Sequence, residues 1–406
     1  MPVSNLSEEQ IKEKFTKACD CHQQGLEQEA LQLYNELLLS FPKAFLLNYN
    51  IGLLYYEIND FSQAKKHYLI AQQEYPNSHD LLYNLGLCQK KSGEIEEAKK
   101  SFLEALQCEG DDIDCLYNLA GCYRETEELE HAKLCYEAVL SRDKNYLPAL
   151  SNLAYTCQRM GDKKEALGYY QRVLEIEPQH QGALHMVATI TGVHFNHTSS
   201  QYVEELFDNY AESFDESLIE KLHYQVPQLI KRELLEVVPE TTKFNHLLDI
   251  GCGTGLTGLV LKDMARAMTG VDLSHKMLAK ALEKNIYHHL IPADIEKFAS
   301  QTDQEYDLIV AADVFSYIGN LQEAFGQIDE MAAPGALLVF SMERHENENE
   351  IAPLQLGTTG RFTHSLEYIT TLAREHKMTI LRQTEVTLRE EAASSIQGWL
   401  FVFKTA

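Results

Sequence analysis

The residues whose types and spacing could do chemistry surround a short glycine-rich stretch in the second half of the chain. Residues 249–255 read Asp-Ile-Gly-Cys-Gly-Thr-Gly and join an apolar run to an expected helix. Glycine at such a junction lets the backbone approach a ligand closely, and ligands of alternating α/β sheets bind beyond the carboxyl ends of the strands. The stretch therefore predicts a nucleotide-binding loop.

A glycine-rich loop also suits dinucleotides, and residues 253–258 fit the GxGxxG spacing. Three carboxylates favour a positively charged nucleoside instead. Asp249 precedes the loop, where a carboxylate would attract a cation and repel a pyrophosphate. Asp272 ends the next expected strand, where it could accept from ribose hydroxyls, and Asp294 follows the third.

Candidate groups for acid–base chemistry lie near the later strands and in the helix expected before the first strand. His364 is the preferred candidate for a catalytic base, followed by Tyr317 and Tyr210. Each of them could instead cap a helix or be an ordinary surface group. We expect no metal site, because Cys19-Asp20-Cys21-His22 lacks the ligand spacing of zinc sites and no second ligand pair follows it.

These residues need a framework that brings strand ends together. From His246 onward, short apolar runs alternate with helical stretches, which indicates a parallel sheet covered by helices on both faces. The last two expected strands, 378–388 and 398–403, have no helix between them, so the last strand should run antiparallel. We predict a doubly wound, Rossmann-like α/β domain over residues 196–406, beginning with a short linker at 196–201.

The first half repeats with a period of 34 residues, in blocks that begin at Ile11, Phe45, His79, Ile113 and Leu147. Each block has a small residue at its eighth position, alanine at its twentieth and an aromatic residue at its twenty-fourth. Small residues let two helices pack closely, and neighbouring repeats must stack to bury a common core. We predict an all-α solenoid over residues 1–195, with five repeats from 11 to 180 and a capping helix at 181–193.

Both halves resemble known families. The repeats are similar to tetratricopeptide repeats, and the second half resembles class I S-adenosylmethionine-dependent methyltransferases, with a helix at 201–215 that covers the cofactor in that family. The resemblance implies S-adenosyl-L-methionine as cofactor, and for Met277 ordinary core packing stays open as the alternative. The cofactor-binding residues that it implies are Asp249, Gly251, Cys252, Gly253, Gly255, Asp272, Leu273, Met277, Asp294, Ile295 and Asp313.

A second period follows the first helix of the repeats, where asparagine occupies the sixth position of four blocks and tyrosine precedes it in three. These residues are Asn50, Asn84, Asn118 and Asn152, with Tyr49, Tyr83 and Tyr117. The resemblance places this helix on a concave surface, where an amide can both donate to and accept from a bound peptide backbone. The asparagines could instead serve contacts between neighbouring helices.

The composition narrows the partners and the location. A net charge of −26 should repel nucleic acid and anionic membrane surfaces. The first ten residues lack the apolar region of a signal peptide, and no apolar stretch of about 18 residues follows, so we expect neither export nor membrane insertion. We therefore expect a cytoplasmic location with reduced cysteines.

Taken with the resemblance, these features favour an enzyme that transfers a methyl group to an acceptor recruited by the repeats, on a protein or a peptide. One alternative is a small-molecule methyltransferase whose repeats serve assembly. The other is a scaffold with a methyltransferase fold and no catalysis, which the intact glycine loop and Asp249 disfavour.

Overall fold

A computed structural model describes residues 7–109, 111–191, 199–212, 214–345, 352–357, 360–391 and 394–406. The chain forms two compact units, Met1–Pro178 and Gln179–Ala406. The boundary expected between residues 195 and 196 lies outside the described residues, as does the first half of the expected linker at 196–201. The helix expected to cap the repeats, α11 (Gln181–Thr191), belongs to the second unit.

The described contacts of α11 explain this assignment. His185 is buried, and its Nε2 donates to the Gly360 carbonyl oxygen at 2.8 Å. The His185 ring also stacks on Tyr202, with ring centroids 4.7 Å apart. Both partners are residues of the second unit. The boundary between the units therefore follows Pro178, on the N-terminal side of the boundary expected after residue 195.

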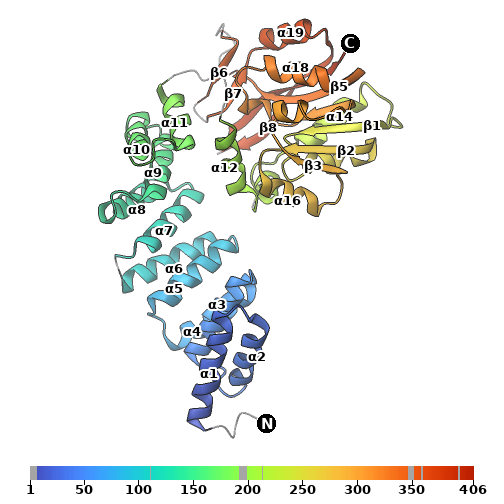
Figure 1. Ribbon diagram of the computed structural model, residues 1–406. Coiled ribbons are helices and arrows are strands. Elements are labelled where there is room, and N and C mark those ends of the chain that lie inside the picture. Colours follow the sequence, from blue (N-terminus) through green and yellow to red (C-terminus); the bar gives the residue numbers. More distant parts are fainter. Residues whose placement is uncertain are drawn as a thin grey trace. The chain divides into compact units, whose positions relative to one another are not determined.

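The first unit is built from successive helix pairs, two helices in each repeat (Figure 1). Its helices are α1 (Glu8–Gln23), α2 (Glu27–Leu38), α3 (Phe45–Glu57), α4 (Phe61–Glu74), α5 (His79–Lys91), α6 (Ile95–Cys108), α7 (Ile113–Glu125), α8 (Leu129–Arg142), α9 (Leu147–Arg159) and α10 (Lys163–Ile176). The repeat pattern therefore predicted this all-α unit correctly.

Close packing within each pair explains the repeated residue types. A Cβ atom on Gly52 would lie 2.5 Å from Tyr68 Cε1, and one on Gly86 would lie 2.7 Å from Phe102 Cε1. The aromatic ring of a repeat thus lies directly on the small residue of the same repeat. Both rings are completely buried, which requires the two residue types to occur together.

The second unit contains a seven-stranded sheet in the order β3-β2-β1-β4-β5-β9-β8. Strands β3, β2, β1, β4 and β5 are parallel, whereas β9 pairs antiparallel with both β5 and β8. This confirms the Rossmann-like sheet with an antiparallel last strand. The strands are β1 (Phe244–Ile250), β2 (Ala265–Asp272), β3 (His289–Pro292), β4 (Tyr306–Ala311), β5 (Ala332–Glu343), β8 (Thr379–Glu391) and β9 (Ser394–Lys404).

Helices cover both faces of this sheet because the side chains of its strands alternate between them. Leu248 and Ile250 face one apolar cluster, which includes residues of α18 (Gln322–Met331) and α19 (Leu366–Glu375). Leu247 faces a second cluster, which includes residues of α14 (Val226–Leu235) and α15 (Leu256–Leu261). Figure 1 shows α18 and α19 together on one side of the sheet.

The second unit also contains further helices and short strands outside the seven-stranded sheet. A small second sheet pairs β6 with β7 and was not predicted from the sequence. These elements are α12 (Ser200–Tyr210), α13 (Phe214–Glu216), η2 (Ser217–Lys221), η3 (Lys262–Met264), α16 (His275–Glu283), α17 (Ile295–Ala299), η4 (Phe315–Tyr317), β6 (Leu354–Leu356) and β7 (Phe362–His364).

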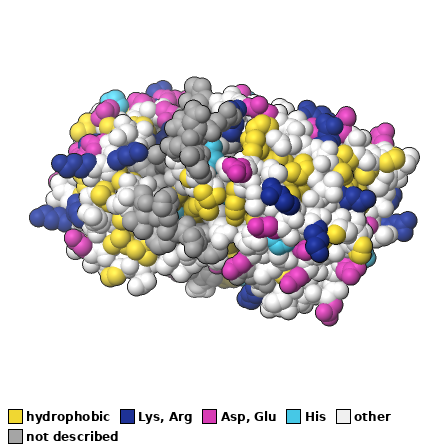
Figure 2. Space-filling view, turned by 90° about the horizontal axis from the view of Figure 1, so that it is seen from above, with side chains coloured by type: hydrophobic (Ala, Val, Ile, Leu, Met, Phe, Trp, Pro, Cys, Tyr) yellow, Lys and Arg dark blue, Asp and Glu magenta, His cyan; other side chains and the backbone are white. Residues whose placement is uncertain are grey.

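The described surface carries mixed charge. On the face in Figure 2, Lys and Arg side chains are scattered among Asp and Glu, and the described residues there form no continuous basic patch. Among the residues that the structure describes, no helix has the length and apolar character needed to span a bilayer.

Candidate active site

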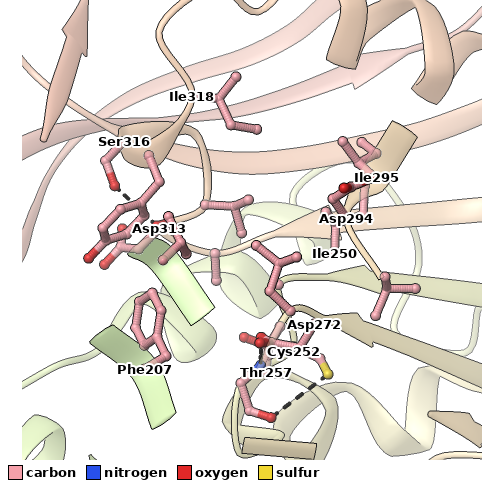
Figure 3. A pocket seen from close by; sticks show the side chains of 18 of the residues that line it. Phe207, Ile250, Cys252, Thr257, Asp272, Asp294, Ile295, Asp313, Ser316 and Ile318 are labelled. Carbon is pink, nitrogen blue, oxygen red and sulfur yellow. Dashed lines mark hydrogen bonds between the residues drawn. The ribbon is translucent and has the colours of Figure 1, made fainter. Parts of the chain in front are cut away.

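A cavity of about 450 Å³ lies at the carboxyl ends of the parallel strands of the second unit. This volume is within the range of small-molecule sites in proteins. Residues 251–254 and Asp272 line what we call the glycine-loop end, and Tyr317, Arg361 and Arg389 line what we call the arginine end. In Figure 3, Cys252 and Asp272 lie apart from Phe207 and Ser316, which border the other side of the cavity.

The glycine loop brings its backbone to the cavity surface. Gly251 and Gly253 have φ values of 61° and 53°, a conformation that side chains disfavour. A Cβ on Gly251 would lie 2.5 Å from Val314 Cγ2, so only glycine fits there. A Cβ on Gly253 would meet only Phe214 Cε1, at 3.7 Å, so this backbone borders open space. Gly251, Cys252 and Gly253 all line the cavity as the sequence predicts.

The Asp272 carboxylate is held at the glycine-loop end by the backbone. Its Oδ2 accepts from Gly253 N and its Oδ1 from Ser274 N, both at 2.8 Å. Burial raises the pKa of Asp272, and these backbone donors oppose the rise. The strand end therefore fixes a carboxylate at the cavity wall, and the neighbouring Leu273 also lines it.

The loop after β3 contributes the predicted pair Asp294 and Ile295. Both residues line the cavity, and Figure 3 shows them side by side. Asp294 Oδ1 accepts from Lys297 N at 2.7 Å, so it also caps the short helix α17. A carboxylate and an apolar side chain are thus placed together at this wall.

Asp249 does not lie where the sequence reasoning placed it. It is buried behind the loop, outside the cavity lining, and its Oδ2 accepts from Tyr287 Oη at 2.6 Å. Burial raises the pKa of Asp249 to about 7. The reason is strand alternation, since Asp249 follows Leu247 on one face of β1 while Ile250 faces the other. Asp249 therefore supports Tyr287 and does not face a ligand.

Tyr287 was missed by the sequence reasoning, although three glycines make room for its ring. Cβ atoms on Gly255, Gly258 and Gly270 would come within 3.0, 2.3 and 3.1 Å of Tyr287 side-chain atoms. Gly255 was expected to bind the cofactor, yet it lies outside the cavity lining and instead precedes α15 with a φ of 90°. These glycines lie far from Tyr287 in the chain, so the sequence gives no local signal for it.

Met277 belongs to the core. Its side chain is completely buried and lies outside the cavity lining, which agrees with the packing alternative. Its backbone N donates to Ser274 Oγ at 3.1 Å, so this position mainly completes the start of α16.

The segment before β1 covers the glycine-loop end through contacts with loop residues. Asp208 Oδ1 accepts from Ser274 Oγ at 2.5 Å, and Asp215 accepts from Thr254 Oγ1 and from Lys284 Nζ. Phe207 and Phe214 line the cavity from this segment. Tyr210, a candidate catalytic residue, is instead 51% exposed and lies outside the lining, because α12 directs it to solvent.

At the arginine end, Asp313 follows β4 with a φ of 58°. Asp313 N donates to Ser341 Oγ at 2.9 Å, and Ser341 Oγ donates to Asp313 Oδ1 at 2.7 Å. Arg389 Nη1 lies 3.7 Å from Asp313 Oδ2. The predicted Asp313 therefore lines the cavity as part of an ion pair.

Two guanidinium groups meet at one carboxylate oxygen. Glu343 Oε1 accepts from Arg389 Nη2 at 2.5 Å, and Arg361 Nη1 lies 3.4 Å from the same oxygen. Arg361 Nε donates to Tyr317 Oη at 3.2 Å, and the predicted Tyr317 lines the cavity. Sequence reasoning missed Arg389, which occupies a strand with no local signal of function.

His364 is not positioned to act as a base. It is 1% exposed and lies outside the cavity lining, and its Nε2 donates to the Gly319 carbonyl oxygen at 2.8 Å. Burial lowers the pKa of His364 to about 4. A neutral ring fixed in this way serves the packing of β7 and is not placed to act as a catalytic base.

The asparagines of the repeats hydrogen-bond to tyrosines of the preceding repeat. Asn84 Nδ2 donates to Tyr49 Oη at 3.0 Å and to the Asp80 carbonyl oxygen at 2.8 Å. The pairs Asn118–Tyr83 and Asn152–Tyr117 repeat this bond at 3.4 and 2.9 Å, and Asn50 donates to the Leu46 carbonyl oxygen at 2.7 Å. These bonds favour the alternative that asparagine serves contacts between helices.

Among the residues that the structure describes, no cluster of three or more His, Cys, Asp or Glu side chains could hold a metal ion.

Comparison with known proteins identifies both units. A family model described as a methyltransferase domain matches residues 222–376. Three models described as tetratricopeptide repeats match residues 49–114, 113–146 and 148–180. Two similar solved structures are a tetratricopeptide protein with an unusual peptide-binding site, YrrB (22% identity, 42% of this chain and 89% of that chain, TM-score 0.41), and the N-methyltransferase NodS from Bradyrhizobium japonicum with S-adenosyl-l-homocysteine (22%, 44% and 85%, 0.35).

Curated relatives match the second half. A malonyl-[acyl-carrier protein] O-methyltransferase of Halalkalibacterium halodurans is 32% identical over 210 residues, 48% of this chain and 75% of that protein. A trans-aconitate 2-methyltransferase of Paracidovorax citrulli is 30% identical over 118 residues, 29% of this chain and 45% of that protein. With this identity over three quarters of a relative, the chain belongs to the class I S-adenosylmethionine-dependent methyltransferases, in a form that also carries tetratricopeptide repeats.

Proposed function

We propose that the cavity binds S-adenosyl-L-methionine and that the enzyme methylates an acceptor carried by a protein or peptide that the repeats recruit. The observation that carries the proposal is the meeting of the glycine-loop backbone and the half-buried Asp272 carboxylate at one cavity wall. When bound, S-adenosyl-L-methionine supplies a methyl group made electrophilic by a sulfonium sulfur.

The residues at the glycine-loop end fit this cofactor. Asp272 would accept from the ribose hydroxyls, and Asp294 with Ile295 would border the adenine. Two carboxylates in a partly enclosed cavity favour a cation and oppose the pyrophosphate of a dinucleotide. This charge argument now depends on Asp272 and Asp294, because Asp249 lies behind the loop.

The enzyme's own contribution is to align the acceptor and to exclude water. Phe207 and Phe214 border the cavity from the covering segment, which is tied to the glycine loop by Asp215 and Thr254. Fixing two reactants in line can lower a barrier by about 7–11 kcal/mol, so methyl transfer needs no covalent help from the protein.

Recruitment of a carried acceptor has support in the names of relatives. Several act on malonyl-[acyl-carrier protein], a substrate attached to a protein. Asparagine and tyrosine recur at the same positions of successive repeats, and an extended peptide that lies along them would exchange the bonds between Asn and Tyr for bonds to its own backbone. The second candidate, a small-molecule acceptor, is favoured by relatives named for trans-aconitate and for ubiquinone biosynthesis.

A labelled-methyl experiment separates these candidates. The intact protein is incubated with bacterial lysate and S-adenosylmethionine tritiated on the methyl group, and the products are divided into macromolecular and small-molecule fractions. We expect macromolecular label that falls in the double variant Asn84→Ala, Asn118→Ala and persists in the control Asn35→Ala, which changes an exposed residue of α2. Label confined to small molecules would favour the second candidate, and no transfer at all would contradict both.

A further inference from the structure

We propose that His185 is a positioning residue that ties two walls of the cavity together and thereby slows the release of S-adenosylhomocysteine. This inference rests on the proposed methyl transfer, in which S-adenosylhomocysteine is the product, and adds a residue that governs turnover. It is carried by two contacts of one buried side chain, which bonds to Gly360 and stacks on Tyr202. We call this pair of contacts the His185 latch.

The first contact of the latch holds the loop before β7. His185 Nε2 lies 2.8 Å from the Gly360 carbonyl oxygen, and a carbonyl oxygen only accepts, so Nε2 carries the proton. Burial lowers the pKa of His185, which keeps the ring neutral. Gly360 has a φ of 79°, and a Cβ there would lie 2.9 Å from His185 Nε2. Only glycine therefore lets the histidine approach this closely.

This bond acts directly on one wall of the cavity. The Gly360 carbonyl belongs to the same peptide unit as the backbone N of Arg361, and Arg361 lines the cavity. The loop is also a tight turn, since Gly357 N donates to the Arg361 carbonyl oxygen at 2.8 Å and Gly360 N donates to the Gly357 carbonyl oxygen at 3.0 Å. Fixing the Gly360 carbonyl therefore fixes the backbone from which the Arg361 side chain extends.

The second contact of the latch holds helix α12. The His185 ring stacks on Tyr202, with 4.7 Å between the ring centroids and 22° between the ring planes. Ser200, Val203 and Phe207 of the same helix line the cavity. Their spacing of three and four residues puts them on one face of α12, and Tyr202 lies outside that face. His185 thus contacts the outer side of a helix whose inner side is a cavity wall.

The same two walls also meet at the cavity itself. The Phe207 ring packs edge to face against the Tyr317 ring, with centroids 5.3 Å apart, and Tyr317 Oη accepts from Arg361 Nε at 3.2 Å. Helix α12 and the loop before β7 are therefore joined twice, once within the lining and once outside it through His185. Because the latch lies outside the lining, its loss changes closure without removing a contact to a bound ligand.

The latch comes from a part of the chain that neither family model covers. The last repeat model ends at residue 180, and the methyltransferase model begins at residue 222. His185 lies between them, in the helix α11 that follows the repeats directly in the chain. Closure of the cavity therefore depends on a segment that is not part of the matched methyltransferase domain.

Two variants of the intact protein each remove one contact of the latch. His185→Phe keeps a ring against Tyr202 and loses the donor to Gly360, whereas His185→Gln keeps an amide donor and loses the ring. A latch fails when either end is released, so we expect each variant to speed dissociation of tritiated S-adenosylhomocysteine about fivefold. His131→Ala is the matched control, because His131 stacks on Tyr123 in the first unit, with centroids 5.0 Å apart.

The variant His185→Ala removes both contacts and separates a latch from two independent contacts. We expect its dissociation rate to exceed that of either single variant by less than about twofold. Independent contacts would instead multiply to about 25-fold over the wild type, and that result would overturn the latch. Unchanged dissociation in all three variants would overturn it as well.

Hydrogen exchange of the ligand-free protein tests the same link without a cofactor. His185→Phe removes only the bond to Gly360, yet a latch predicts faster exchange in α12 as well as in the loop before β7. Faster exchange confined to that loop, or spread through β1 as general loss of stability, would contradict the latch. Failure of the proposed function would look different, because the wild type would then bind no S-adenosylhomocysteine while the exchange link between α12 and the loop remained.

Discussion

Replacing Gly258 with alanine should destabilise the second unit, although alanine is the better helix former. Gly258 is buried in α15, where a Cβ would lie 2.3 Å from Tyr287 Oη and 2.5 Å from Tyr287 Cζ. The ring cannot move without breaking its 2.6 Å hydrogen bond to the buried Asp249. The substitution therefore tests whether Tyr287 is wedged between the glycine loop and the sheet.

The sizes of the opposing effects decide whether Gly258→Ala lowers or raises the free energy of unfolding. Helix propensity favours alanine over glycine by about 1 kcal/mol. Overpacking costs about 1–3 kcal/mol, and loss of a hydrogen bond to a buried carboxylate costs about 1.5–3 kcal/mol more. The net effect is a destabilisation of about 1.5–5 kcal/mol. Gly168→Ala is the matched control, because nothing lies within 4 Å of a Cβ there.

Hydrogen exchange on the intact chain, followed by mass spectrometry, measures the exchange rate of peptides from each unit separately. Peptides from β1 and α15 should exchange faster in Gly258→Ala, whereas peptides from α10 should exchange more slowly in Gly168→Ala. Equal or slower exchange around α15 in Gly258→Ala would refute the packing argument, since helix propensity alone would then explain both variants.

Three further predictions concern neighbouring contacts. Asp249 has its pKa raised to about 7 from 3.8, so the folded wild type loses stability as pH rises from about 4 to 7. Asp249→Asn does not titrate, and denaturation at a series of pH values should show its stability rising relative to wild type across this range; a constant difference would count against the burial argument. Asn118→Ala should cost about 1 kcal/mol more than Asn50→Ala in urea unfolding, because Asn118 also bonds to Tyr83 of the preceding repeat, and equal costs would remove that role. Asp215→Ala should weaken S-adenosylhomocysteine binding about two- to fivefold by calorimetry, because the covering segment loses its contacts with Thr254 and Lys284, and unchanged affinity would show that these contacts do not matter for binding.

The repeats could be predicted from the sequence because their packing is local. Each aromatic ring lies on a small residue of the same repeat, as Tyr68 lies on Gly52, and the same pair recurs at a fixed interval. The two final strands could also be predicted from the sequence, since no helix separates β8 from β9. Their order was not, because β9 lies between β5 and β8 through pairing that only the folded chain reveals.

The candidate site also contains residues that the sequence could predict and residues that it could not. Asp272 was predicted because a strand end places it at the cavity whatever the rest of the fold does. Asp249 was misplaced although the alternation of Leu247 and Ile250 already puts it on the other face of β1. Tyr287 and Arg389 could not be predicted, since their partners Asp249 and Glu343 lie 38 and 46 residues away in the chain.

The central claim is that the glycine loop and Asp272 hold the adenosyl group of the methyl donor. Calorimetric titration of the intact protein with S-adenosylhomocysteine tests it most directly, with Asp272→Ala as the variant and Asp303→Ala, in an exposed loop, as the control. We expect binding by wild type and control, and a loss of at least about tenfold in Asp272→Ala. Absence of binding by the wild type, or binding of a nicotinamide dinucleotide in its place, would contradict the account.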